Sequence, residues 1–514
     1  MAGTIYHTTI SVLLSNADDA KGAGDGDGRG AKQSDDSDVM DRGGGEPGED
    51  SGALHIDSAQ SLLHDFDPLD RMIDQQLSQQ LSQTPGEVQT EDPEFASIIA
   101  SINLMHLEEL ALTIRRQLFN GLPPEVSCTV STPPRAGSYN IVYKLSFSDG
   151  IKWAIRIPAD GDVRKPSRIR SFHLDIVTQR FISSRTSMPI PQIHYWSLDS
   201  SNILSRPFVI MDFIPGTNLW KLWNDRNWIT DQKREKIFEQ IARWMTELSA
   251  LEFDQIGCLD WDEASGTHRI VPFPDSSLFL VRLSEEQDSA AVPAGPFNTA
   301  HEYLSFLLTL RRRFSDSSIL AILQLFLSAL PDSTLDGPPF TLCPPDFDFQ
   351  NVLVDDDGTI TGIIDWDGVR TLPRQGGAAT YPAWLTVDWN PISYGWRKDS
   401  SPEHNIHYDS PIQLASYRRA YLDAITRASG GKLTHITRNS HIWTTLHNAI
   451  CSEITASTIV LHLSKFVFGS SLVAIEVEEG IRGSTWFALR NTPEAIAEIP
   501  GKMCHPISIL LFIR

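Results

Sequence analysis

Apolar residues recur every three or four positions from residue 95 to residue 112, and this spacing predicts a helix. The positions that set the period are Phe95, Ile98, Ile99, Ile102, Leu104, Leu107, Leu110 and Leu112. Two runs of alternating or β-branched residues follow at 141–147 and 153–157. The turn Ser148-Asp149-Gly150 between them predicts a β-hairpin. We therefore expect strands in the first part of the fold.

The pattern becomes mainly helical beyond residue 216. Before that point we expect a helix over 169–183 and a strand over 208–213. After it, the spacing predicts helices over 218–223, 231–251, 300–313, 317–330, 410–426 and 441–466. One polar island, residues 351–365, contains the turn Asp356-Asp357-Gly358 and predicts a second hairpin. The sequence therefore indicates an α+β fold, with a β-rich part followed by a helix-rich part.

Charge is concentrated at the start of the chain. The 514 residues carry a formal charge of −22, and residues 1–95 hold 20 acidic and 5 basic side chains. Residues 16–52 are rich in Gly, Asp and Ser and cannot bury enough apolar surface to offset the entropy lost on ordering. We expect residues 1–93 to be a disordered acidic tail, with a transient amphipathic helix near 62–81. The acidic balance argues against a general nucleic-acid binder, which needs a basic surface.

Membrane association is not expected. No apolar stretch reaches the roughly 20 residues of a membrane helix, and residues 319–330 are typical of a core helix. Residues 1–15 lack the basic region and cleavage site of a signal peptide. The cysteines are scattered, which favours reduced thiols, so we expect a cytoplasmic protein. The oligomeric state stays open.

The polar island carries the strongest candidate site. Asp346 is followed by Asn351 five residues later and by Asp365 fourteen residues beyond that, and the last two flank the predicted hairpin. Such spacing can bring three oxygen-bearing side chains to one point. Mg²⁺ prefers oxygen ligands, and phosphoryl transfer also needs an Asp that accepts the proton of the attacking hydroxyl. The alternative is an acidic surface loop with incidental aspartates.

The strings DFDFQNVLVDDDG and ITGIIDWDGV resemble the aminoglycoside phosphotransferase family of the protein-kinase-like superfamily, and within it the large fungal branch. The resemblance implies a two-lobed kinase-like fold, with an N-lobe over 94–215 and a helical C-lobe over 216–499. It implies Asp346 as the catalytic base, Asn351 as a metal ligand and Asp365 as the principal metal ligand. The implied activity is ATP-dependent, Mg²⁺-assisted transfer of the γ-phosphate to a hydroxyl of a small molecule.

The resemblance also assigns a phosphate-covering loop before the first strong strand. In kinase-like folds the backbone N–H groups of this loop lie over the ATP phosphates. The loop residues here are Gly137, Ser138, Tyr139 and Asn140. Without the resemblance, the same residues would be an ordinary turn.

Four further residues receive nucleotide-binding roles from the resemblance. Arg156 corresponds to the phosphate-binding cation, and Asp175 corresponds to the helix residue that forms an ion pair with that cation. Met211 and Phe213 lie in the segment that resembles the hinge between the lobes, near the adenine. The alternatives are a strand-edge arginine, a solvated helix aspartate and two core residues.

Two departures from the family pattern leave other functions open. The family has a His two residues before the catalytic Asp, and here Pro344 occupies that place and cannot make its hydrogen bonds. A catalytically impaired pseudokinase that binds nucleotide or a partner is therefore an alternative, as is an interaction protein whose functional part is the acidic tail. Residues 500–514 do not resemble the family and are assigned nothing. His441 and His447 are expected to be ordinary helix residues.

Overall fold

The computed structural model describes residues 93–137, 139–159, 166–274, 294–311, 317–391, 394–400 and 404–468. The expected acidic tail, apart from Pro93, lies outside these residues, as do the proposed 62–81 helix and the 500–514 tail. The described residues form two compact units. The first contains residues 93–311 and 331–459, and the second contains residues 317–330 and 460–468.

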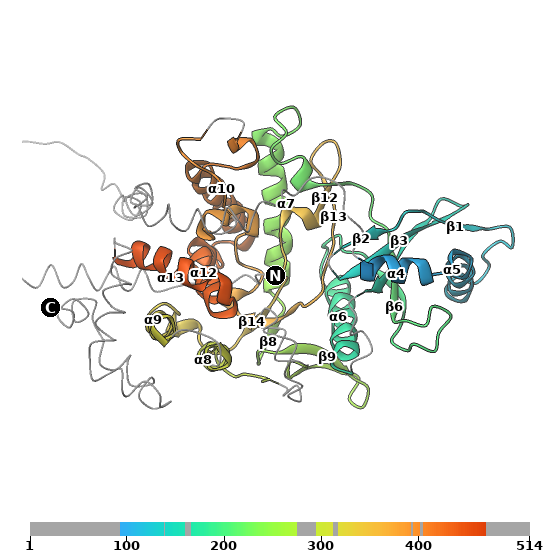
Figure 1. Cartoon of the computed structure of the whole chain (residues 1–514), viewed down its shortest axis with the longest axis horizontal. Coiled ribbons are helices and arrows are strands. Elements are labelled where there is room, and N and C mark those ends of the chain that lie inside the picture. Colours follow the sequence, from blue (N-terminus) through green and yellow to red (C-terminus); the bar gives the residue numbers. More distant parts are fainter. Residues whose placement is uncertain are drawn as a thin grey trace, which may run out of the picture. The chain divides into compact units, whose positions relative to one another are not determined.

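A six-stranded antiparallel sheet forms the N-lobe of the first unit (Figure 1). Its order is β1-β3-β4-β6-β5, and β2 also pairs with β3. The strands β3 and β4 are the hairpin that the sequence predicts around the 148–150 turn. The six strands are β1 (Cys128–Val130), β2 (Arg135–Ala136), β3 (Asn140–Phe147), β4 (Lys152–Pro158), β5 (Ile193–Ser197) and β6 (Phe208–Asp212).

Helices cover both faces of this sheet. On one face, α4 (Pro93–Ser101) and α5 (Leu104–Leu118) bury apolar side chains against Tyr143, Leu145 and Ile155. On the other face, α6 (Pro166–Arg185) packs against Ala154. Side chains two residues apart on a strand share a face. The side chain of Arg156 in β4 therefore lies on the α6 face.

The single helix expected over residues 95–112 is in fact two helices, α4 and α5. Asn103 lies between them and caps α5, because its side chain accepts a hydrogen bond from the backbone N–H of Met105 at 3.0 Å. Asparagine is favoured at an N-cap over a helix interior, which explains the break. None of the described helices alone could cross a bilayer, and only the bent pair Phe95–Ser101 and Leu104–Leu118 meets the length and composition required.

The C-lobe is built around two long helices, α7 (Asp231–Ser249) and α10 (Pro411–Ser429), which lie side by side (Figure 1). Their core contains Trp223, Phe238 and Tyr421. The other helices are α8 (Ala300–Arg311), α11 (Thr434–Arg438), α12 (Ser440–Cys451) and α13 (Glu453–Phe468), the last of which continues into the second unit. The second unit also contains α9 (Ser317–Ala329), where the pattern predicts a helix.

Small strands complete the C-lobe in two three-stranded sheets, β14-β11-β8 and β13-β12-β7, and one hairpin, β9–β10. They are β7 (Thr217–Asn218), β8 (Glu252–Phe253), β9 (Cys258–Asp262), β10 (Thr267–Val271), β11 (Phe340–Cys343), β12 (Val352–Val354), β13 (Ile360–Ile363) and β14 (Arg370–Pro373). The predicted hairpin over 351–365 is confirmed as β12 and β13. The observed architecture is the expected α+β fold in two lobes.

Two predicted helices of the C-lobe were wrong in extent. Residues 218–223 form only a single 3₁₀ turn, η2 (Leu219–Lys221), because Thr217 and Asn218 pair with β12. The helix expected over 441–466 is broken at Ser452, between α12 and α13. His441 and His447 are buried residues of α12, and His447 Nε2 lies 3.1 Å from the hydroxyl of Tyr303.

A buried ion pair fixes a C-lobe loop to α10. The guanidinium of Arg418 contacts the carboxylate of Asp388 through two atom pairs, Nη1–Oδ1 at 2.6 Å and Nη2–Oδ2 at 2.9 Å. Arg418 Nη1 also donates to the carbonyl of Leu385 at 2.7 Å. The two charged side chains are 5% and 6% exposed. Because water reaches neither side chain freely, each charge is stabilised by the other, and removing one would leave the other buried without its partner.

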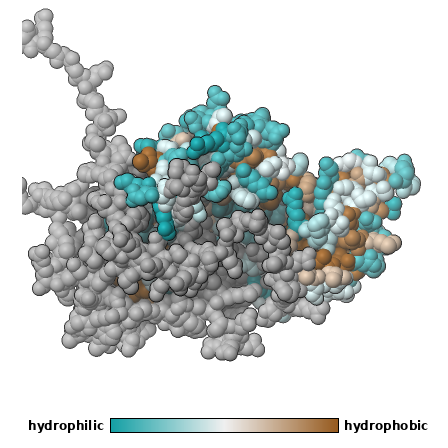
Figure 2. All heavy atoms as spheres, turned by 45° about the horizontal axis from the view of Figure 1, so that its top comes forward, coloured by the Kyte–Doolittle hydropathy of each residue, from teal (hydrophilic) through white to brown (hydrophobic). Residues whose placement is uncertain are grey.

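Apolar side chains reach the surface of the N-lobe, where brown patches lie among polar atoms at the right of Figure 2. Large exposed apolar residues of this lobe include Leu104, Met105, Leu118 and Phe119 on and just after α5, and Ile151 at the β3–β4 turn. None of the described cysteines, at positions 128, 258, 343 and 451, is in a disulfide bond.

Candidate active site

The hairpin β12–β13 brings two of the predicted site residues together. Asn351 directly precedes β12, and Asp365 follows β13 by two residues. Val352 pairs with Ile363 in register, and the N–H of Ile364 donates to the carbonyl of Asn351 at 2.9 Å. The two ends of an antiparallel hairpin must meet. The fold therefore places Asn351 and Asp365 next to each other.

Asp346 lies at the same place and is held by two side-chain amides. Asn351 Nδ2 donates to the carbonyl oxygen of Asp346 at 2.9 Å and to its Oδ2 at 3.1 Å. Gln350 Nε2 donates to the same Oδ2, also at 3.1 Å. Among the described residues no donor reaches Asp346 Oδ1. The carboxylate is thus fixed through one oxygen and keeps the other available to accept a proton.

Asp365 has an unusual backbone conformation, with φ = 62°. A non-glycine residue in the left-handed region costs on the order of 1 kcal/mol and is typical of functional sites. Its side chain is 48% exposed. Partial burial, together with repulsion from Asp367 and Asp346, raises the pKa of Asp365 to about 6, against the lowering effect of Arg156. A cation bound at this carboxylate would favour its charged form.

Arg156 contacts the loop that follows β13 through Asp367. Its Nη1 lies 2.6 Å from Asp367 Oδ1 and 3.9 Å from Asp365 Oδ1. Asn140, from the loop expected to cover phosphates, donates through Nδ2 to Asp367 Oδ2 at 3.3 Å. Arg156 is only 9% exposed, and its Nε has no hydrogen-bond partner among the described residues. Asp367 therefore connects two groups to which the family resemblance gives phosphate-binding roles.

The expected ion pair between Arg156 and Asp175 is not formed. Asp175 Oδ1 instead accepts a hydrogen bond from the backbone N–H of Gly368 at 2.8 Å. The arginine pairs with Asp367, which lies one residue from Gly368. Asp175 thus helps to hold the loop that carries Asp365. Sequence reasoning missed Asp367 and Gln350, although both stand in the motifs that carry the resemblance.

Asp175 predicts a pH effect on stability. Burial and repulsion from Asp367 raise the pKa of Asp175 to about 8, while an unfolded Asp titrates near about 3.9. Between these values the folded chain binds the proton more tightly, so the free energy of unfolding falls as the pH rises, by at most about 1.4 kcal/mol for each unit of pH. The free energy of unfolding can be measured with urea at about pH 5.5 and at about pH 7.5. Between these two values we expect it to fall less for Asp175→Asn than for the parent. Other titrating groups are common to both proteins, so equal falls would contradict the prediction.

The loop between β2 and β3 is a tight turn. The N–H of Gly137 donates to the carbonyl of Asn140 at 2.9 Å, and the N–H of Ala159 donates to the carbonyl of Tyr139 at 2.8 Å. The second contact ties the turn to the end of β4, three residues after Arg156. Ser138 lies outside the described residues. Gly137, Tyr139 and Asn140 are therefore placed close to the strand that carries the cation.

The hinge segment leads from β6 directly to the hairpin of the site. Met211 is buried on the α6 face of the sheet, and Phe213 is partly buried with Lys144 Nζ 4.9 Å from its ring centre. Gly216 has φ = 142°, and a Cβ there would lie 2.5 Å from Thr361 Oγ1, so only glycine fits. Thr217–Asn218 then pairs with β12.

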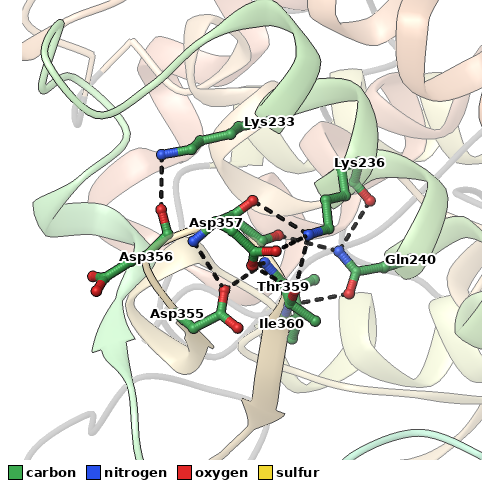
Figure 3. A network of polar contacts seen from close by, with 9 residues as sticks. Lys233, Lys236, Gln240, Asp355, Asp356, Asp357, Thr359 and Ile360 are labelled. Atoms are coloured by element: carbon green, nitrogen blue, oxygen red, sulfur yellow. Dashed lines mark hydrogen bonds and ion pairs between the residues drawn. The ribbon is translucent and has the colours of Figure 1, made fainter.

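The tip of the hairpin is anchored to α7 (Figure 3). Lys236 Nζ contacts Asp357 Oδ2 and Thr359 Oγ1, each at 2.9 Å, and Lys233 Nζ donates to the carbonyl of Asp356 at 2.9 Å. Gln240 accepts from the N–H of Ile360 and donates to the carbonyl of Gly358. These contacts fix the hairpin to α7, and the hairpin in turn positions the polar residues at its base.

The donor set fits Mg²⁺ only together with phosphate. Among the described residues no group of three or more His, Cys, Asp or Glu is arranged to hold a metal ion. Asp365 offers one carboxylate, and Asn351 offers its amide oxygen because its Nδ2 is used by Asp346. Mg²⁺ is usually bound by one or two carboxylates, with substrate phosphates and water completing the octahedron. The residues present match that pattern.

Residues 131–374 match the model of a family described as the phosphotransferase enzyme family. Curated relatives include "Altered inheritance of mitochondria protein 9, mitochondrial" from Candida albicans, 26% identical over 137 residues, and the protein of the same name from Meyerozyma guilliermondii, 28% identical over 138 residues. Each match covers 26% of this chain and 22% of the relative, so the matched part is about a fifth of the relatives' length.

Similar solved structures include aminoglycoside phosphotransferase APH(2'')-Ib bound to ADP, with a TM-score of 0.37 and 13% identity over 71% of this chain and 98% of that chain. Another is macrolide 2'-phosphotransferase MphH from Brachybacterium faecium, with a TM-score of 0.37 and 12% identity over 74% of this chain and 98% of that chain. Both are distant. The family match itself includes every residue of the candidate site. Over residues 131–374, just under half of its length, the chain is therefore similar to the phosphotransferase enzyme family.

Proposed function

We propose that this chain transfers the γ-phosphate of ATP to a hydroxyl group of a small molecule. The observation that carries the proposal is the convergence of Asp346, Asn351 and Asp365 at the base of one hairpin, next to the buried cation Arg156. Phosphoryl transfer needs little covalent chemistry from the protein and depends on positioning and charge stabilisation. The site contains groups of the required types.

Each residue has one role in the proposed reaction. Asp346 Oδ1 accepts the proton of the acceptor hydroxyl as the new oxygen–phosphorus bond forms and the bond from the γ-phosphorus to ADP breaks. Asp365 and Asn351 would hold Mg²⁺, which would supply charge neutralisation. Arg156 binds phosphate oxygens, and a guanidinium can do so with two parallel hydrogen bonds. Its buried Nε, which has no partner among the described residues, is consistent with a further acceptor.

The hinge and the loop at 137–140 complete the nucleotide site in this proposal. The adenine lies near Met211 and Phe213, and the backbone of the β2–β3 turn covers the phosphates. In the present structure Asp367 occupies both Arg156 and Asn140. Arg156 therefore exchanges a carboxylate for phosphate oxygens when ATP binds. Arg156 forms charge-assisted hydrogen bonds in both states, with the carboxylate of Asp367 before ATP binds and with phosphate oxygens afterwards.

The second candidate is a module that binds nucleotide without turnover. Pro344 favours it, because a proline cannot replace the hydrogen bonds of the family's histidine. Thermal shift and turnover together separate the two candidates. Binding of Mg·ATP without hydrolysis or transfer would select the binding module.

The first test is the melting temperature of the chain with ATP, with and without Mg²⁺. A ligand at about a hundred times its Kd adds about 2.7 kcal/mol to the stability of the native state. We expect a rise that depends on Mg²⁺ in the parent and is lost in Asp365→Asn. Asp254→Asn, at an exposed aspartate of the C-lobe, is the matched control and should behave as the parent. A parent without any rise at saturating Mg·ATP would contradict the proposal.

A further inference from the structure

The replacement of the catalytic-loop histidine by Pro344 raises the question of what else orients Asp346. A carboxylate is attached through a torsion between sp³ and sp² carbons, which has broad minima and allows the two oxygens to exchange. One hydrogen bond to one oxygen leaves this rotation largely free. A general base needs its accepting oxygen within hydrogen-bond reach of the hydroxyl, and small displacements are costly.

Asn351 alone gives limited control over this torsion. Both hydrogens of its amide group are directed to Asp346, one to the backbone carbonyl and one to Oδ2. Asn351 is only 7% exposed, and its backbone carbonyl accepts from the N–H of Ile364. Its position is therefore set by the hairpin, and it supplies a single donor to the carboxylate.

Gln350 supplies the second donor from a different point of the backbone. Its Nε2 donates to Asp346 Oδ2 at 3.1 Å. Its backbone carbonyl accepts from Asn218 Nδ2 at 2.5 Å, so the segment after the hinge fixes its main chain. The residue is exposed, and its side chain is not part of the apolar core. Two donors on Oδ2 hold the carboxylate plane and leave Oδ1 for the acceptor.

We propose that Gln350 is a positioning residue that sets the orientation of Asp346 and takes over the role of the missing histidine. The inference rests on the proposed function, since it concerns the base of that reaction. Gln350 forms hydrogen bonds with Asp346 and Asn218. Neither of these residues belongs to the proposed phosphate-binding groups. Gln350 therefore affects turnover and not the affinity for nucleotide. The inference also predicts that Pro344 does not by itself make the chain inactive.

The test compares Gln350→Ala with the isosteric Gln350→Glu in the full chain, with Mg-dependent ATP hydrolysis as the reaction and water as the acceptor. We expect Gln350→Ala to lower kcat about ten- to a hundredfold, the value of one hydrogen bond to a charged group, with KM for ATP within about twofold. Gln350→Glu keeps the size of the side chain but opposes two carboxylates, and we expect it to lower kcat at least as far. Gln232→Ala, at an exposed glutamine of α7, is the matched control and should match the parent.

A packing role gives the opposite pattern, because Gln350→Glu would then keep the parent's kcat. That result, or a kcat of Gln350→Ala within about twofold of the parent, would overturn the inference. A loss of kcat with an equal rise in KM would also overturn it.

A second measurement does not depend on activity. Gln350→Ala and Asp346→Ala each remove the same contact, so the drop in melting temperature of the double variant should be smaller than the sum of the single drops by about 2 °C. Additive drops would overturn the positioning role even with an active parent. Coupled melting temperatures in a parent without turnover would instead overturn the proposed phosphotransferase, and with it the need for a positioned base.

Discussion

Asp346→Asn is expected to lower kcat for Mg-dependent turnover of ATP by about a thousandfold, within the range found for removal of a general base. The amide is the same size as the carboxylate but cannot take a proton from the attacking hydroxyl. Because Asp346 is half-buried and fixed by two amides, the substitution leaves the fold and the hairpin in place. Steady-state kinetics with ATP at saturation would measure the effect.

The matched control is Asp356→Asn, at the exposed tip of the same hairpin. Asp356 makes its described hydrogen bond through its backbone carbonyl, so the substitution should leave both turnover and melting temperature unchanged. Asp346→Asn should keep the melting temperature of the parent and its Mg-dependent response to ATP. Turnover within about tenfold of the parent would remove Asp346 from the role of base.

Arg418→Met is expected to lower the free energy of unfolding by about 3–5 kcal/mol, the cost of leaving one charge of a buried pair without its partner. Both side chains of the Arg418–Asp388 pair are more than nine-tenths buried. The methionine removes two hydrogen bonds to Asp388 and one to the carbonyl of Leu385. Urea unfolding followed by tryptophan fluorescence would measure the change, since Trp384 and Trp389 flank the loop.

Two comparisons sharpen this test. Arg427→Met removes an exposed pair with Glu239 on the neighbouring turns of α10 and α7, and should cost less than about 1 kcal/mol. Asp388→Asn in the Arg418→Met background removes the buried charge that has lost its partner. It should recover part of the free energy of unfolding that Arg418→Met loses. Equal decreases in the free energy of unfolding for Arg418→Met and Arg427→Met would show that burial does not increase the contribution of the Arg418–Asp388 pair to stability.

The elements with local signals were predictable. The hairpins β3–β4 and β12–β13 each have a turn of small or acidic residues between two apolar runs, and α7, α8 and α10 have clear helical spacing. Their order indicates a β-rich part followed by a helix-rich part, and the two-lobed arrangement was implied by the family resemblance. Strands such as β8 and β11 were not predicted because they are two to four residues long and pair with distant segments. Their stability comes from partners that local pattern cannot identify.

The candidate site shows the same division. The spacing of Asp346, Asn351 and Asp365 is local to one hairpin, so their proximity could be expected from the sequence. The ion-pair partner of Arg156 could not be predicted, because Asp367 and Asp175 both come from other segments of the chain. The backbone N–H of Gly368 donates a hydrogen bond to Asp175, and Arg156 pairs with Asp367 instead. The role of Gln350 depends on the direction of one amide group. The assigned functions of these residues remain predictions for the experiments above.

The pairing of Thr217–Asn218 with β12 has a mechanical consequence. The chain that leaves the N-lobe becomes a strand of the same sheet as the β12–β13 hairpin within five residues of β6. The two hydrogen-bonded strands move as one body, and the tip of that body is fixed to α7 (Figure 3). At this connection, a change in the angle between the N-lobe sheet and the hairpin would have to be absorbed between Asp212 and Gly216. In the proposed function the adenine lies next to this connection, so a bound nucleotide would resist such a change.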